Sequence, residues 1–463
     1  MVLGKVFERF VQYTSVSVMM RGVLENLFAR ESLDQLFVET ARRQRHRELL
    51  FSAVVDLLSL VVAGVRKSVH EAYEAAREQF TVAVQSVYNK LNRVEPEVSR
   101  ELVRRTAGRL ARVVRQLIPQ EDRFWRGFRV KIVDGNHFPA TEHRLKETRT
   151  TRSGPLPGQA LVVLEPALML ATDVFPCEDG HAQERSLLPE VLETIQPRDL
   201  WIADRNFCTT DFLFGITARQ GCFLIRQHGS TLTYELLGER GRVGRCETGM
   251  VYEQGMRLIH PDGRELTIRR ITIALDEPTR DGETEIHLLT NASKRRLPAR
   301  VAAEKYRGRW TVENAFQELS QALHSEINTL GYPRAALLSF SIALMTYNAM
   351  SVVKTALAVA HPEKAQRKDV SGYYLASEIS AAYHGMMIAI PETAWAKQFG
   401  DLSSVRMARI LRRLATGVRI ERFLKRSRGP KKPRPQRTSG RRYHHVSTAR
   451  LLAQRKKTPA MKA

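Results

Sequence analysis

The chain is 463 residues long, is 43% hydrophobic and 26% charged, and has a formal net charge of +24. This composition is typical of a folded globular protein and excludes a chain that is disordered along its whole length. A charge this positive predicts a polyanionic partner, most commonly nucleic acid. The four cysteines are spaced too irregularly for zinc ligation or a disulfide framework, and the first residues lack the layout of a signal peptide. We therefore expect a cytoplasmic protein that binds nucleic acid.

Helical apolar spacing dominates the beginning of the chain, with almost no strand pattern. We predict that residues 1–120 form an all-helical, DNA-binding N-terminal domain. In its last helix Arg105, Arg109, Arg112 and Arg115 recur at steps of four or three residues, so they share one face. Such a face is either simply solvated or in contact with phosphates, and we take Arg105, Arg109 and Arg112 as candidate DNA contacts.

The middle of the chain predicts a discontinuous α/β core. Residues 121–227 contain three successive strand patterns, a helix and another strand, which indicates the first part of a mixed core. Residues 228–295 are rich in strand patterns separated by turns and predict a β-rich insertion. Helical spacing returns at 296–361, the second part of the core, and continues through a helical C-terminal region at 362–424.

One stretch of the second core part reaches the length of a membrane span. Residues 335–353 carry no charge, but they include six Ser, Thr, Tyr or Asn residues. This polar content favours a buried helix, so we expect no membrane association.

Basic residues crowd the end of the chain. Residues 425–463 contain 14 Lys or Arg and no acid, and therefore supply 14 of the 24 excess positive charges. Prolines interrupt this segment and prevent a regular element. We predict a basic, disordered tail.

Three carboxylates stand at positions where a site could form. Asp134 follows the apolar strand RVKIV, and Asp204 ends the strand LWIA. Each aspartate on its own is most often a turn or N-cap residue. Glu313 shares one edge of a helix with Tyr306 and Arg309, beside an apolar stripe. A surface salt bridge is the alternative interpretation of that edge.

Bringing three carboxylates together requires cations. Two carboxylates ~4 Å apart repel each other by ~4 kcal/mol at an effective dielectric constant of about 20. Oxygen-only ligation suits Mg²⁺ or Mn²⁺. Two such ions ~4 Å apart activate water or a 3′-hydroxyl on one side and stabilise the leaving oxygen on the other. These three residues therefore predict phosphodiester chemistry.

The same residues resemble a known family. Asp134 in IVDGNH, Asp204 in WIADRNFC and the helix that begins Tyr306-Arg-Gly-Arg309 and contains Glu313 are similar to the Asp-Asp-Glu (DDE) transposases of the insertion-sequence-four family. The signature of that family is Tyr, two residues, Arg, three residues, Glu, six residues, Lys. Its members also carry a β insertion between the second Asp and the Glu. The resemblance implies a ribonuclease-H-like catalytic core, interrupted by the β-rich insertion and flanked by all-helical N-terminal and C-terminal regions.

Two features depart from the family pattern. Ser320 stands where the signature has Lys, which removes one expected DNA contact, although Gln317 and His324 lie on nearly the same helix face as Tyr306. The insertion contains no Trp to stack on a flipped base. Tyr234 or Tyr252 is a candidate substitute there, but each is more often an ordinary strand aromatic.

The resemblance implies an enzyme that acts on DNA. Asp134, Asp204 and Glu313 would be both the catalytic residues and the ligands of two Mg²⁺ or Mn²⁺ ions, while Tyr306 and Arg309 would hold the DNA backbone. The expected function is a nucleoid-associated transposase of an insertion sequence. It would bind transposon-end and target DNA as a homodimer in the synaptic complex. The alternatives are a nuclease of the same fold without strand transfer and a catalytically silent DNA-binding protein.

Overall fold

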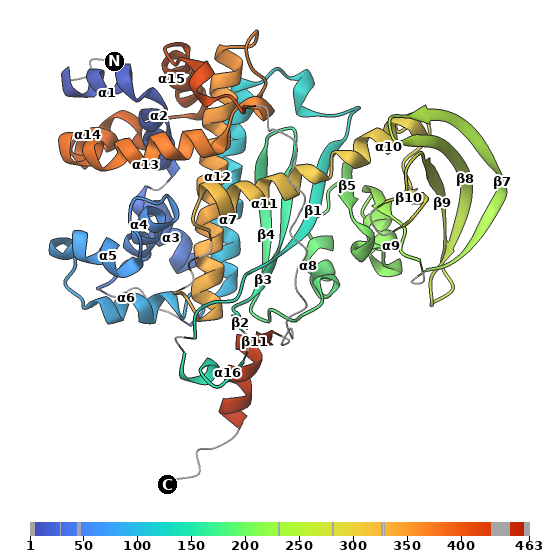
Figure 1. Cartoon of the computed structure of the whole chain (residues 1–463), viewed down its shortest axis with the longest axis horizontal. Coiled ribbons are helices and arrows are strands. Elements are labelled where there is room, and N and C mark those ends of the chain that lie inside the picture. Colours follow the sequence, from blue (N-terminus) through green and yellow to red (C-terminus); the bar gives the residue numbers. More distant parts are fainter. Residues whose placement is uncertain are drawn as a thin grey trace.

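A computed structural model describes residues 5–27, 29–43, 48–143, 145–152, 154–229, 232–279, 282–325, 327, 329–426 and 445–457. A large mixed sheet occupies the centre and right of Figure 1, and most helices from both ends of the chain gather on its left. The predicted mixed α/β fold is thereby confirmed.

The central sheet has nine strands in the order β4-β3-β1-β5-β6-β10-β9-β8-β7. Strand β1 pairs antiparallel with β3 and parallel with β5, β3 pairs antiparallel with β4, and β5 pairs parallel with β6. In chain order, the first five strands of this sheet are β1 (Arg129–His137), β3 (Gln159–Glu165), β4 (Leu170–Cys177), β5 (Asp199–Ala203) and β6 (Cys222–Arg226).

The insertion extends this sheet and does not form a sheet of its own. Its strand β10 pairs antiparallel with β6, and the remaining insertion strands follow outward to β7, which forms the outer edge in Figure 1. The four insertion strands are β7 (Thr233–Cys246), β8 (Gly249–Ile259), β9 (Glu265–Leu275) and β10 (Glu285–Thr290).

Both faces of the sheet carry apolar residues, and each face packs into a separate hydrophobic core. Because successive side chains of a strand point to opposite faces, Ile132 and Val133 of β1 belong to different cores. The first core also contains α7 (Pro96–Leu117) and α12 (Pro333–Ala360), which pack against each other and against β4. The second core contains α8 (Leu188–Leu192) and α9 (Thr210–Ala218).

Helices from both ends of the chain share the first core. Besides α7, the N-terminal helices are α1 (Lys5–Tyr13), α2 (Ser15–Leu27), α3 (Arg30–Thr40), α4 (Phe51–Val62), α5 (Val69–Ala75) and α6 (Val84–Leu91). The C-terminal helices are α13 (Gly372–Ala389), α14 (Glu392–Trp395) and α15 (Ser404–Thr416). These two regions therefore pack as one helical body.

Helix α12 alone among the described helices is long and apolar enough to cross a membrane. Its most apolar 18-residue stretch is 94% buried inside the protein, where it packs against α7 and other helices of the first core. The helix therefore serves as the central core helix, in line with its polar Ser, Thr and Asn content.

Part of the basic tail has regular structure, which corrects the prediction of disorder for those residues. The short strand β11 (Val446–Ser447) pairs with β2 (Pro155–Leu156), and α16 (Thr448–Lys457) follows it. Arg450 donates to Asp179 at 2.7 Å, and Ser447 and Thr448 are buried. The tail residues 427–444 and 458–463 lie outside the described residues.

Candidate active site

The parallel pairing of β1 and β5 places Asp134 and Asp204 side by side. Ile132 pairs with Ile202 at the end of the paired register, and each aspartate stands two residues farther along its strand direction. Neighbouring strands lie ~4.8 Å apart, so the two backbones remain close at this level. Asp204 also accepts a hydrogen bond at 2.8 Å from the backbone N–H of Asn206, which fixes the carboxylate as the cap of a short helical turn.

Arg309 brings Glu313 to the same place. It lies between α10 (Ala299–Arg307) and α11 (Trp310–Ala322), and its guanidinium reaches in two directions. Nη1 donates to Asp134 Oδ2 at 2.6 Å, and Nη2 donates to Glu313 Oε1 at 2.7 Å. Arg309 therefore joins helix α11 to Asp134 of β1, which lies 175 positions earlier in the sequence.

The electrostatics show that the three carboxylates share one environment. The pKa of Asp134 is raised to about 6, mainly by burial; Arg309 opposes this shift, and the negative charges of Asp204 and Glu313 contribute to it. The pKa of Tyr306 is also raised, mainly by burial, with Asp204 contributing in the same direction. Arg309 thus joins Asp134 and Glu313 directly, and Asp204 and Tyr306 lie close enough to interact electrostatically with this cluster.

The donor set fits a divalent cation, although the side chains are not arranged around one here. Among the described residues, no three His, Cys, Asp or Glu side chains lie close enough together to hold a metal ion. The three carboxylates nevertheless offer only oxygen atoms, which Mg²⁺ and Mn²⁺ prefer. Arg309 supplies the positive charge between two of them, so metal binding requires this ion pair to rearrange.

Glu184 is a further acid at this site that the sequence analysis did not identify. It begins η4 (Glu184–Leu187), and its Oε2 accepts a hydrogen bond from Asn206 Nδ2 at 2.5 Å. Its Oε1 lies where a Cβ on Gly135 would stand, at 1.8 Å from the ideal position, and 3.6 Å from His137 Nδ1. Glu184 therefore fills the space beside both aspartates. No sequence pattern distinguishes it from the other acids of its helical stretch.

Replacing Gly135 with Ala is expected to displace the Glu184 carboxylate, because the new methyl group would overlap it. Losing a side chain that supports catalytic groups typically lowers activity by about 10- to 100-fold. Cleavage rates of Gly135→Ala, Glu184→Ala and the double variant test this prediction. If Gly135 acts only through Glu184, the double variant should be no slower than Glu184→Ala, whereas multiplied losses would contradict the link.

The predicted DNA contacts on α7 differ in their surroundings. Arg105 forms ion pairs with Glu39 at 2.6 Å and Glu101 at 3.3 Å, and Arg109 donates to Ser32 Oγ at 3.2 Å. These two arginines hold α7 against α3. Arg112 is exposed, so contact with DNA stays a prediction that its position permits.

The position of the missing signature Lys is occupied by an exposed serine. Ser320 Oγ donates to the Gln317 backbone oxygen at 3.2 Å. Gln317 and His324 are also exposed, and their substitution for the Lys stays a prediction.

Two other carboxylates, one within β4 and one directly after it, do not join the site. Buried Asp173 lies between Arg100 and Arg104 of α7, at 3.5 and 3.4 Å. Glu178 accepts from Arg334 Nε at 2.9 Å. Both acids therefore connect helices to the sheet.

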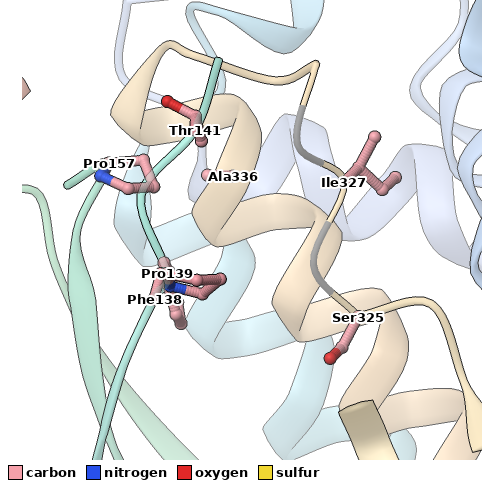
Figure 2. Close-up of a pocket in the computed structure, with 7 residues that line it drawn as sticks. All are labelled: Phe138, Pro139, Thr141, Pro157, Ser325, Ile327 and Ala336. Carbon is pink, nitrogen blue, oxygen red and sulfur yellow. The ribbon is translucent and has the colours of Figure 1, made fainter. Parts of the chain in front are cut away.

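Figure 2 shows a small cavity between the segment that follows β1 and the start of α12. Its volume is about 20 Å³, which suffices for about one water molecule. Its lining is mainly apolar and comprises Phe138, Pro139, Thr141, Pro157, Ser325, Ile327 and Ala336. The cavity is a packing gap and offers no binding site for a nucleotide.

The sheet with an acidic cluster beside β1 and β5 is compatible with a nuclease fold of the DDE class. Residues 125–349 match the model of a family described as a transposase DDE domain. This match supports membership of a DDE transposase family, which typically acts on DNA with divalent metal ions. The matched region contains Asp134, Asp204 and Glu313 and leaves out most of the flanking helices. No curated protein matches the chain significantly.

Proposed function

We propose that the chain is the transposase of an insertion sequence. It binds the ends of its transposon, cuts the DNA there and joins the freed 3′-hydroxyl to target DNA. The observation that carries this proposal is that Arg309 pairs with both Asp134 and Glu313, and that the charge of Asp204 raises the pKa of Asp134, within the region that matches the transposase DDE domain.

We assign the catalytic roles from the secondary-structure element that carries each carboxylate and from how exposed the carboxylate is. Asp134 and Asp204 belong to adjacent strands of a buried sheet, so their separation is fixed by the backbone. Glu313 comes from a helix and is more exposed, at 37% of its side chain against 15% for Asp134. We assign to Glu313 the role of the ligand that moves when DNA and metal bind. Arg309 neutralises the site until then and afterwards holds the DNA backbone together with Tyr306.

Two Mg²⁺ or Mn²⁺ ions held by Asp134, Asp204 and Glu313 would supply the activated oxygen nucleophile and the stabilised leaving group. The protein contributes fixed carboxylate positions and a half-buried setting, in which charges interact more strongly than in water. We also propose that the enzyme works as a homodimer that pairs two transposon ends, and that it is nucleoid-associated.

A ribonuclease-H-like core is the finer fold assignment that we propose. Its support is the strand arrangement, in which antiparallel β4, β3 and β1 precede parallel β5 and β6. The insertion-sequence-four subfamily is proposed on Tyr306, Arg309 and Glu313, with Ser320 as the departure from its signature.

The test is incubation of the purified chain with Mg²⁺ and a plasmid carrying the repeats that flank its gene. A transposase should cut at the repeat ends and join them to new DNA. Cutting without joining would indicate the nuclease alternative, and binding without cutting would indicate a silent DNA-binding protein.

Removal of residues 425–463 is expected to weaken binding to all DNA sequences alike, because this segment has 14 cations and no acid. If about five of them contact phosphates, the slope of log K against log salt should fall in magnitude by ~4–5. End and random DNA should lose affinity equally, since phosphate contacts carry no sequence information. Titrations of both DNAs over a salt series measure this. An unchanged slope would contradict a DNA role for the tail.

A further inference from the structure

Helix α15 presents a basic face that the sequence analysis did not single out. At ~100° per residue, Arg406, Arg409 and Arg413 fall within a ~60° arc. The opposite side buries Met407, Leu411 and other apolar residues in the first core. All three arginines are exposed, and the helix contains no acid.

These arginines are free, unlike those of α7. Within the part of the chain that the structure describes, the side chains of Arg406, Arg409 and Arg413 make no ion pair, hydrogen bond or ring contact. From residue 403 to residue 426 there are eight Arg or Lys and a single acid, Glu421. That acid is already paired with Lys364 at 2.6 Å. The positive charge of the helix is therefore not compensated locally.

The helix is also held rigidly. Arg412, on the flank of the basic face, donates to the backbone oxygens of Gln116 and Leu117 at the end of α7, at 2.8 and 2.9 Å. Helix α15 packs against α7, α12 and α2, at the top of the helical body in Figure 1. A cation attached to such a support loses less freedom on binding than one on a flexible segment.

We propose that the outward face of α15, formed by Arg406, Arg409 and Arg413, binds the phosphate backbone of DNA. The three residues span ~10.5 Å of helix axis at 1.5 Å per residue, enough for several phosphates at 3.4 Å of duplex axis per strand. This inference rests on the proposed transposase function and names the surface that receives part of the DNA. It places that contact on the C-terminal helices, since Arg105 and Arg109 of α7 are engaged within the protein.

The experiment compares the full chain with a variant that carries Arg406→Gln, Arg409→Gln and Arg413→Gln. Affinity for a DNA fragment with the flanking repeats is measured over a salt series. Loss of three phosphate contacts should lower the magnitude of the salt slope by about 2–3. The control carries Arg43→Gln, Lys67→Gln and Arg93→Gln, three exposed cations outside α15, and makes the same change in charge. Thermal unfolding of both variants should match the unsubstituted chain, because none of the replaced side chains is buried.

A slope that falls in the α15 variant and not in the control would support the proposal. If the salt slope is the same for the α15 variant and the control variant, the proposed DNA contact on α15 is wrong, and a protein partner for this face is favoured. Cleavage of the same fragment with Mg²⁺ separates the two levels of the argument. If the unsubstituted chain cuts the ends but the α15 substitutions leave its salt slope unchanged, the proposed transposase function stands and the proposed DNA contact on α15 is wrong. If the α15 substitutions lower the salt slope but the unsubstituted chain never cuts the DNA, the DNA contact on α15 stands and the proposed transposase function is wrong.

Discussion

Changing Asp134 to Asn, Asp204 to Asn or Glu313 to Gln is expected to lower DNA cleavage and strand transfer by at least ~10³-fold, equivalent to several kcal/mol of lost transition-state stabilisation. Each amide keeps the shape of the side chain but loses the charge that a divalent ion requires. Binding to end DNA should stay within a few-fold, because it depends on Lys and Arg residues outside the site. Gel-shift and cleavage assays on the same protein preparations measure both effects.

Glu277→Gln provides the matched control, since Glu277 is an exposed carboxylate of the insertion. It should cut as fast as the unsubstituted chain. Normal cleavage by any one of the three site variants would remove that residue from the catalytic set. Simultaneous loss of cleavage, end binding and thermal stability would instead assign the residue a folding role.

The second large effect is expected at a buried ion pair behind the site. Lys354 of α12 donates to Glu318 of α11, and its side chain is only 4% exposed. Burial lowers the pKa of Lys354, and the charge of Glu318 opposes this shift. Glu318 in turn packs against Gly372, where a Cβ would come within 1.9 Å of the carboxylate. This pair fixes α11, and with it Glu313, to the core helix.

Lys354→Met is therefore expected to destabilise the protein by up to about 3–5 kcal/mol, because it leaves the largely buried Glu318 charge without its partner. Adding Glu318→Leu should recover most of that loss, since an apolar pair of similar volume is often neutral. The exposed pair Lys364–Glu421 supplies the control, and Lys364→Met should leave the stability nearly unchanged because water screens this pair. Urea unfolding curves measure all three variants. A double variant less stable than Lys354→Met would contradict this explanation.

The amino-acid sequence predicted the mixed core because its strands have clear apolar patterns and turn residues between them. Asp204 lies directly after its strand, as predicted, but β1 continues past Asp134 to His137, so Asp134 lies inside its strand and not at the end. Glu313 was recognisable through its helical spacing from Tyr306 and Arg309. Their catalytic roles stay predictions. The continuation of the sheet into the insertion was not predictable, because the pairing of β10 with β6 joins residues about 60 positions apart.

Side-chain partners distant in sequence were the main omissions. Glu184 reaches Asn206 and Gly135 only after folding, and Lys354 meets Glu318 across two helices. The strand β11 has two residues, too few for any periodic pattern. The arginines of α7 have a regular spacing, but the same spacing is expected whether they contact DNA or other parts of the protein. Spacing alone therefore does not distinguish these two roles.

The proposed function depends most directly on whether the chain joins DNA ends to a new target. The measurement is a strand-transfer reaction with the unsubstituted chain, Mg²⁺, a donor fragment bounded by the flanking repeats and a target plasmid, followed by sequencing of the products. We predict donor ends joined to target DNA, with a short target duplication at both sides once gaps are filled, and no such products with Asp134→Asn. Donor DNA that is cut but never joined, or products that Asp134→Asn forms equally well, would contradict a transposase that works through this site.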